Sequence, residues 1–330
     1  MGFVAAAVAI LAALLVLLVA LVAYTAAVAR RAQARVPPLG RFVDVDGARL
    51  HYVDRGRGPV VVLLHGLGGN LRNFHALIER LAPDHRVVAL DRPGCGYSTT
   101  ASAAQPDLFE QARIVAAFLR ALDLRQPLVV GHSMGGALAL ALALDFPDHV
   151  GSLVLLSPAS HEVREPPAPF KGLDVPSPVL RRVLAWTLAT PLGQLAHERM
   201  LAAVFAPDAV TPGFDVEGGG ALGARPGNFI AASADMVALP AALAAMAPRY
   251  PSLSLPVQVV FGRDDPICPL ALHGLPLAAA VPGAALHLLD GGHMIPLTQA
   301  DAVAALLRKA AAERREAATV RTPVANVVPA

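Results

Sequence analysis

Gly131-His132-Ser133-Met134-Gly135-Gly136 stands where the chain is expected to change from a strand to a helix. The apolar run of residues 128–130 precedes it, and the alternating alanines and leucines of residues 137–144 follow it. A serine flanked by glycines between a buried strand and a helix is typical of a nucleophile elbow, a turn that leaves no room for side chains at Gly131 and Gly135. The competing interpretation is a glycine-rich turn that happens to contain a serine.

Short apolar runs and longer helical stretches alternate along the rest of the chain. The runs of strand length are too continuous to have one wet face, and they cover residues 59–64, 86–90, 127–130, 152–156, 257–261 and 285–289. A hairpin around Asp46-Gly47 begins the pattern, with strands at 41–45 and 48–53. Helices are predicted at 74–81, 108–122, 134–144 and 302–315. This alternation predicts an α/β fold with a mostly parallel, doubly wound sheet covered by helices on both faces.

About a hundred residues separate the runs at 152–156 and 257–261. They contain proline-rich joints, a flexible break at Gly218-Gly219-Gly220, and helical pieces near 179–189, 194–205 and 229–247. Because the strand pattern returns afterwards, we expect an inserted helical cap and not a second independent domain. The predicted organisation is an anchor with a basic flank at 1–35, core at 36–157, cap at 158–255, core at 256–315 and a disordered tail at 316–330.

The hydroxyl of Ser133 is a weak nucleophile, so it needs a base, and the base needs an orienting acid. His293 follows the last predicted strand, at the sheet edge where catalytic groups gather, and is the candidate base. Asp264 and Asp265 both follow the penultimate strand. Adjacent side chains of an extended backbone point opposite ways, so only one of them can reach His293. Pro266 biases Asp265 towards that extended conformation.

His65-Gly66-Leu67-Gly68-Gly69 follows the strand predicted at 59–64. A glycine-rich loop at this place leaves a backbone N–H, that of Leu67, free to face a substrate oxygen. The N–H of Met134 at the start of the next helix would complete an oxyanion hole. A plain tight turn is the alternative. A phosphate loop is excluded because no Gly-Lys-Ser/Thr follows.

These residues together resemble the α/β-hydrolase superfamily, in particular its capped esterase and lipase group. The resemblance runs from about residue 41 to residue 308, and it includes residues 91–98 (DRPGCGYS), similar to a structural D-x-P-G-x-G-x-S turn of that family. It implies a triad of Ser133, His293 and Asp265, since the family's acid usually lies three residues after the glycine that ends the strand. It implies no metal and no organic cofactor.

The implied reaction is hydrolysis of a carboxylic ester in two acyl transfers through Ser133. C–C bond hydrolases of aromatic-ring degradation are the nearest alternative, because residues 262–265 (GRDD) look like theirs. Those enzymes generally have Asn before the nucleophile and a G-P-G loop, where this chain has His132 and Leu67-Gly68-Gly69. A cofactor-free haloperoxidase could use the same triad. A non-catalytic binding module, which predicts a damaged triad, is the alternative from another class.

The first residues form an uninterrupted apolar segment, with no charge from Gly2 to Ala29. As a helix, these roughly 28 residues would be about 42 Å long, more than a hydrocarbon core of about 30 Å. A signal peptide would have a basic start and a shorter apolar core. We therefore expect a single-pass membrane anchor through residues 3–29. The basic residues on its C-terminal flank place the catalytic part in the cytoplasm by the positive-inside rule: Arg30, Arg31, Arg35 and Arg41.

Composition excludes several other classes. The net charge is +2 and no Lys/Arg run is interleaved with aromatics, so nucleic acid is not expected as a partner. The two isolated cysteines, Cys95 and Cys268, form neither a disulfide framework nor a metal motif.

The anchor would hold the catalytic part close to acyl lipids, so single-chain esters such as monoacylglycerols are the favoured substrates. We expect apolar residues at helical spacing in the cap to form an acyl pocket near Ser133. The candidates are Leu180, Leu184, Trp186, Leu188, Leu195, Met200, Leu201 and Phe205.

Overall fold

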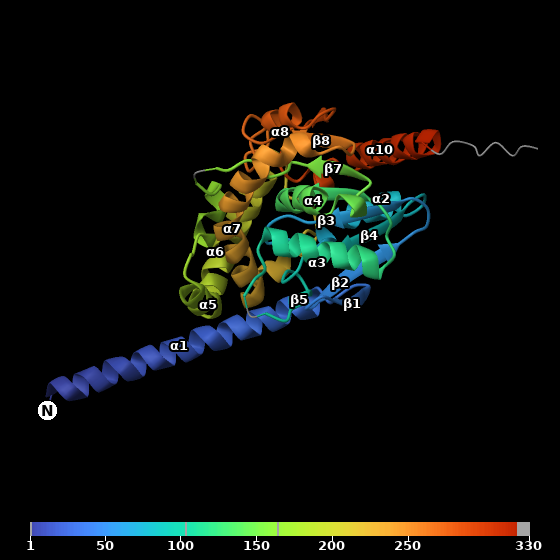
Figure 1. The fold of residues 1–330 in the computed structure, drawn as a ribbon. Helices are drawn as coiled ribbons and strands as arrows, with labels where there is room; N and C mark the ends of the chain where they lie inside the picture. Colours follow the sequence, from blue (N-terminus) through green and yellow to red (C-terminus); the bar gives the residue numbers. More distant parts are fainter. Residues whose placement is uncertain (1, 103, 164, 322–330) are drawn as a thin grey trace, which may run out of the picture.

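A computed structural model describes residues 2–102, 104–163 and 165–321 (Figure 1). A nine-stranded sheet lies at its centre, in the order β1-β2-β4-β3-β6-β7-β8-β9, with β5 paired to β2. The strands are β1 (Arg41–Val45), β2 (Ala48–Arg55), β3 (Val60–Leu64), β4 (Arg86–Leu90), β5 (Thr99–Thr100), β6 (Leu128–His132), β7 (Ser152–Leu156), β8 (Val257–Gly262) and β9 (Ala285–Leu289). From β4 to β9 all neighbours are parallel, which confirms the predicted sheet.

Helices cover both faces of the sheet, as the continuous apolar strands predict. Val62 and Leu64 of β3 join the core beneath α3 (Leu108–Ala121) and α4 (Met134–Asp145). The alternate residues Val61 and Leu63 join the core beneath α2 (His75–Leu81) and α10 (Ala300–Arg321). Successive strand side chains point to opposite faces, and all four are fully buried. The sheet domain also contains the short helices η1 (Leu71–Phe74), η2 (Pro147–His149), α8 (Gly274–Ala280) and α9 (Ile295–Thr298).

The closing helix α10 ends later than predicted. It continues to Arg321, so residues 316–321 are helical and the expected disordered tail does not begin at 316. The added segment is Glu-Ala-Ala-Thr-Val-Arg, in which alanine, glutamate and arginine are good helix formers. Residues 322–330 of the expected tail lie outside the described residues.

The segment between β7 and β8 is helical and lies over the C-terminal edge of the sheet (Figure 1). Its elements are η3 (Ala168–Leu173), α5 (Pro178–Trp186), α6 (Ala189–Phe205), η4 (Gly220–Ala224), α7 (Pro226–Met246) and η5 (Ala247–Ser252). We refer to it as the cap. The glycines expected to be a flexible break are instead tied to the core, because the amides of Asn73 and Asn70 donate to the carbonyls of Gly218 and Gly219, at 2.8 and 3.1 Å.

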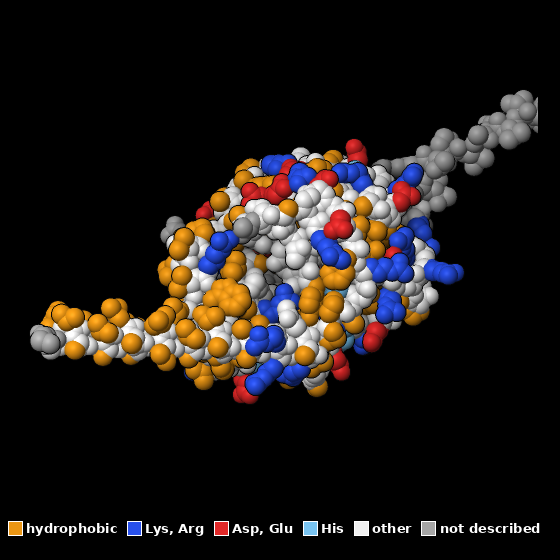
Figure 2. Space-filling model, turned by 90° about the horizontal axis from the view of Figure 1, so that it is seen from below, with side chains coloured by type: hydrophobic (Ala, Val, Ile, Leu, Met, Phe, Trp, Pro, Cys, Tyr) orange, Lys and Arg blue, Asp and Glu red, His pale blue; other side chains and the backbone are white. Residues whose placement is uncertain are grey.

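Helix α1 (Gly2–Arg35) projects from the globular part as a straight rod (Figures 1 and 2). Residues 2–20 are exposed, apart from a half-buried Ala7. The following turns pack against η4, α5 and α6, and bury Thr25 and Ala32. Helix α1 is long and apolar enough to cross a membrane. A second stretch, Pro226–Ser252, passes the same test, but 44% of its apolar window is buried as part of the cap.

The residues after α1 are held firmly. Three backbone carbonyls of this connection accept hydrogen bonds from core side chains: Val36 from Tyr97, Pro37 from Arg72, and Leu39 from His51. The connection that contains Pro37-Pro38 is therefore a fixed joint between α1 and the sheet.

Candidate active site

Ser133 occupies a strained turn at the C-terminal end of β6. Its backbone has φ 55° and ψ −121°, a region that residues other than glycine rarely adopt. A Cβ atom at Gly135 would lie 2.0 Å from the carbonyl oxygen of Leu64, and one at Gly131 would lie 2.2 Å from that of Gly135. The two glycines are therefore required for β3, the turn and α4 to approach this closely.

We expect Ser133→Gly to be more stable than Ser133→Ala. Glycine would relieve a strain of about 1–3 kcal/mol, at a cost in chain entropy of about 0.5–1 kcal/mol. Thermal unfolding of the two variants measures the difference. The matched pair Ser152→Gly and Ser152→Ala, inside the extended strand β7, should show the opposite order. A Ser133→Gly protein less stable than Ser133→Ala would show that the turn is not strained.

His293 and Asp265 form a buried pair beside this turn. His293 Nδ1 lies 2.8 Å from Asp265 Oδ2, while Asp265 Oδ1 accepts the N–H groups of Ile267 and Cys268 at 2.8 and 2.9 Å. The neighbouring Asp264 is exposed and has no contact of this kind. Burial alone would raise the pKa of Asp265, but the charge of His293 and these hydrogen bonds lower it below its usual value. Asp265 is thus a carboxylate at neutral pH.

Three other buried histidines lie nearby without a carboxylate partner. Burial lowers the pKa of His65 and of His132 to about 3, and that of His273 to about 4. His132 Nε2 lies 2.9 Å from the backbone oxygen of His293, and His65 Nε2 accepts the N–H of Arg92. These rings are neutral and engaged with the backbone, so of the four histidines around the turn only His293 is coupled to an acid.

Ser133 and His293 are not joined by a hydrogen bond in this structure. The buried thiol of Cys268 lines the same cavity as Ser133, and the backbone N–H of Cys268 is held by Asp265. Catalytic hydrogen bonds are often long before substrate binds and tighten in the complex. The Ser133 hydroxyl and the His293 ring must therefore come into hydrogen-bonding contact before His293 can take the proton.

The loop after β3 brings a second backbone donor towards the elbow. A Cβ atom at Gly66 would lie 3.1 Å from the Cβ of Ser133, so the loop approaches the nucleophile closely. Among the described residues, no acceptor is found for the N–H of Leu67 or for that of Met134. Both donors are thus available to a ligand oxygen, as an oxyanion hole requires.

A fully buried ion pair, which no sequence motif indicates, fixes this loop. Arg92 Nη2 lies 2.9 Å from Asp235 Oδ2 in α7, and the same nitrogen donates to the carbonyl of Gly66 at 3.3 Å. Arg92 also donates to Gln111 of α3 at 2.7 Å. The guanidinium therefore connects the cap, the core and the loop that carries Leu67.

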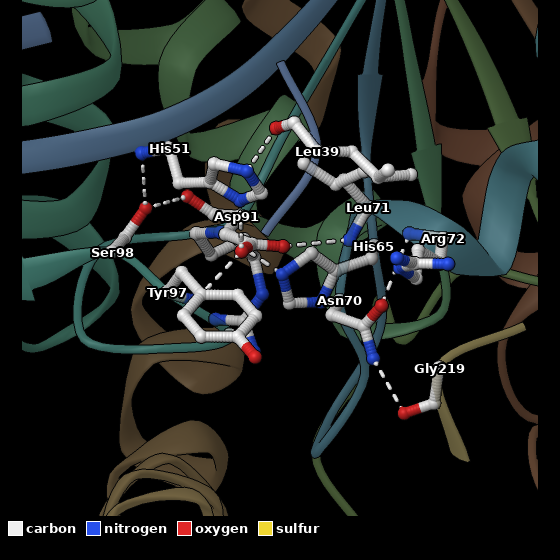
Figure 3. Close-up of polar contacts among 12 residues, drawn as sticks. Leu39, His51, His65, Asn70, Leu71, Arg72, Asp91, Tyr97, Ser98 and Gly219 are labelled. Atoms are coloured by element: carbon white, nitrogen blue, oxygen red, sulfur yellow. Dashed lines mark hydrogen bonds and ion pairs between the residues drawn. The ribbon is translucent and has the colours of Figure 1, made fainter. Parts of the chain in front are cut away.

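Asp91, His51 and Ser98 form a second group of Asp, His and Ser side chains, but this group plays only a structural role (Figure 3). Asp91 accepts from the N–H groups of Leu71 and Tyr97 and contacts His51 Nδ1 at 2.7 Å. The other His51 nitrogen faces the carbonyl of Leu39, so the ring has no free nitrogen to act as a base. The Ser98 hydroxyl donates to the backbone of Asp91.

A cavity opens above Ser133, and the empty space in and over it is about 830 Å³, open solvent included. Its described lining is mainly apolar and includes Leu67, Phe170, Met236, Leu239, Leu243 and Ile267. The residues of α5 and α6 that were expected to form the acyl pocket are absent from the described lining, so that prediction is wrong. The lining comes from η3 and α7 instead, because α7 is the helix that packs on the core through Asp235. Phe205 packs against Phe214, and Leu195 faces outwards.

His273 is a further polar residue of this lining that sequence reasoning missed. Its Nδ1 accepts the N–H groups of Ser160 and His161, at 3.2 and 3.3 Å. The ring proton must therefore be on Nε2, which makes that nitrogen a neutral donor.

Comparison with known proteins gives the family. The model of the alpha/beta hydrolase fold family matches residues 59–300. The chain is 30% identical to a poly(3-hydroxyalkanoate) depolymerase of Ectopseudomonas oleovorans, over 86% of this chain and 96% of that protein. It is 31% identical to a 2-hydroxy-6-oxo-6-phenylhexa-2,4-dienoate hydrolase of Burkholderia cepacia, over 77% of this chain and 88% of that protein. The structure of an enol-lactonase from Burkholderia xenovorans LB400 superposes with a TM-score of 0.67 at 25% identity, covering 82% of this chain and 98% of that one.

Proposed function

We propose that this chain, which belongs to the α/β-hydrolase family, cleaves carboxylic esters by two successive acyl transfers through Ser133. The observation that carries the proposal is the placement of Ser133 on a strained elbow, beside the buried Asp265–His293 pair and beneath an apolar cavity. The depolymerase and the enol-lactonase among its relatives are named for substrates that contain ester bonds, which favours the same chemistry.

In the proposed mechanism, Ser133 Oγ attacks the ester carbonyl while its proton passes to His293 Nε2. Asp265 holds the proton on Nδ1, which keeps the lone pair on Nε2 and stabilises the imidazolium. The N–H groups of Leu67 and Met134 hold the oxyanion. His293 then gives its proton to the leaving alcohol, and a water molecule repeats the sequence on the acyl-enzyme.

We further propose that α1 is a single-pass anchor and that the substrates are single-chain acyl lipids such as monoacylglycerols. Exposed apolar side chains along residues 2–20 support the anchor, and the flanking arginines support a cytoplasmic catalytic part. The apolar lining suits an acyl chain, and the Nε2–H of His273 would be a donor for a polar alcohol group.

The acyl-chain dependence tests this substrate class. Each buried methylene contributes roughly 0.8 kcal/mol, or about fourfold in affinity. If that affinity carries into the transition state, kcat/KM for a monoacylglycerol series should rise several-fold per two-carbon step until the cavity is full. A profile that peaks at acetate and falls steadily would contradict the proposal.

A matched pair of variants locates the acyl site. Leu239→Trp, in the cavity lining, should shift the optimum to shorter chains. Leu180→Trp, on the exposed side of α5, should leave it unchanged for soluble esters. An unchanged optimum in Leu239→Trp would place the acyl chain elsewhere.

C–C bond hydrolysis is the second candidate, favoured by the 31% identity to the dienoate hydrolase. The substrate in that relative's name is a carboxylate. The described residues of the cavity lining include the carboxylate Asp174 and neither lysine nor arginine, an unfavourable environment for an anion. Turnover of the dienoate faster than that of any ester would favour this alternative.

A further inference from the structure

Helices α5 and α6 present a row of large apolar side chains to solvent. Leu195 is 86% exposed and Val179 is 74% exposed. We call the whole set the cap patch; it consists of Val179, Leu180, Val183, Trp186, Leu188, Leu192 and Leu195. Large exposed apolar side chains gathered on two helices that contact each other mark a binding surface.

The cap patch adjoins helix α1. The turns of α1 after residue 20 pack against α5 and α6, and Figure 2 shows apolar side chains continuing from the projecting rod onto the neighbouring end of the cap. The patch is therefore continuous with the surface of α1 that the proposed function places in a membrane.

The length of the exposed part of α1 indicates where the membrane surface would lie relative to the cap. Residues 2–20 span about 28 Å at 1.5 Å per residue, which matches a hydrocarbon core of about 30 Å. Leu21, the next residue, is half-buried, and Thr25 one turn later is fully buried. A bilayer crossed by residues 2–20 would thus end where the cap begins.

The joint after α1 fixes the orientation of the core to the helix. The carbonyls of Val36, Pro37 and Leu39 are held by Tyr97, Arg72 and His51, and Thr25 and Ala32 are buried against the cap. The end of the cap from which α1 projects must therefore face the membrane and cannot swing away from it (Figure 1).

We propose that the cap patch inserts into the headgroup region of the bilayer that α1 crosses, so that the cap is a second membrane contact. The proposal rests on the anchoring part of the proposed function. Interfacial helices of this kind bury their apolar faces about 5–10 Å into the boundary between headgroups and acyl chains. Phe170 and Asp174 line the cavity a few residues before α5 begins at Pro178, so this wall of the cavity is close along the chain to the proposed contact.

The only tryptophan of the chain, Trp186, lies in the cap patch and reports on it directly. The experiment uses the full chain in phosphatidylcholine vesicles whose acyl chains carry bromine either near the carbonyl end or near the methyl end. Bromine quenches tryptophan at short range. We expect strong quenching of Trp186 by bromine near the carbonyl end, weaker quenching by bromine near the methyl end, and little quenching by aqueous acrylamide.

Two double variants complete the experiment, one in the cap patch and one outside it as its control. Val179→Glu with Leu195→Glu should lose most of the bromolipid quenching and hydrolyse vesicle-borne esters more slowly, with kcat for a soluble ester unchanged. Leu272→Glu with Leu275→Glu, at positions near α8 that are also exposed, though less so (53% and 50%), should leave the quenching intact.

Each failure has a distinct result. Full acrylamide quenching without bromolipid quenching, in protein that floats with the vesicles, would overturn the proposal while leaving the anchor in place. Emission protected from both quenchers would mean that another copy of the chain covers the patch, which also overturns it. Protein that does not float would refute the anchor. Unmodified protein that floats and shows the expected quenching, but hydrolyses no ester, would refute the proposed chemistry alone.

Discussion

Replacement of Ser133 by alanine is expected to lower kcat for ester hydrolysis by roughly 10⁴–10⁶ and to abolish labelling by a fluorophosphonate probe. The proposed reaction forms its covalent intermediate on the Ser133 oxygen, and no other hydroxyl stands on an elbow facing both the cavity and the Asp265–His293 pair among the described residues. What remains would be the contribution of binding and of the oxyanion hole.

Ser157→Ala is the matched control for this experiment. Ser157 is also buried, also has a positive φ, and follows the adjacent strand β7. It should keep labelling and turnover close to those of the unmodified protein. Persistent labelling or near-normal turnover in a well-folded Ser133→Ala protein would end the serine-hydrolase proposal.

The parts of the molecule that depend on local sequence could be predicted. Runs such as residues 60–64 have no polar position, so only a sheet covered on both faces can bury them, and glycines on either side of Ser133 allow only a tight turn. The ends of parallel strands meet at one edge, which brings His293 and Asp265 together from separate segments.

What depended on contacts between distant segments could not be predicted. Arg92 and Asp235 are 143 residues apart, and nothing in either segment indicates that a buried ion pair joins them. An apolar stripe on a helix likewise does not tell which surface it meets. The pattern on α5 and α6 therefore predicts cavity-lining residues, whereas α7 and η3 line the cavity. Of the predicted residues, Leu180, Trp186, Leu188 and Leu195 are exposed and Phe205 is buried against Phe214.

Asp265→Asn is expected to lower kcat by roughly 10⁴. The amide would still accept the N–H groups of Ile267 and Cys268, so the turn should keep its shape. Its NH₂ group would face His293 Nδ1, however, and an N–H can only donate to an unprotonated nitrogen. The ring would then carry its proton on Nε2, where it could no longer accept the proton of Ser133.

Asp264→Asn is the matched control, because it makes the same chemical change one residue away on an exposed side chain. Since the Asp264 carboxylate does not contact the His293 ring, we expect kcat and KM to stay within about twofold of the unmodified values, the range of a surface change that touches no catalytic group. NMR of the His293 ring would show the exchange of tautomers in Asp265→Asn alone. A large loss in Asp264→Asn together with a small one in Asp265→Asn would reverse the assignment of the acid. Equal small losses in both would show that His293 works without a carboxylate.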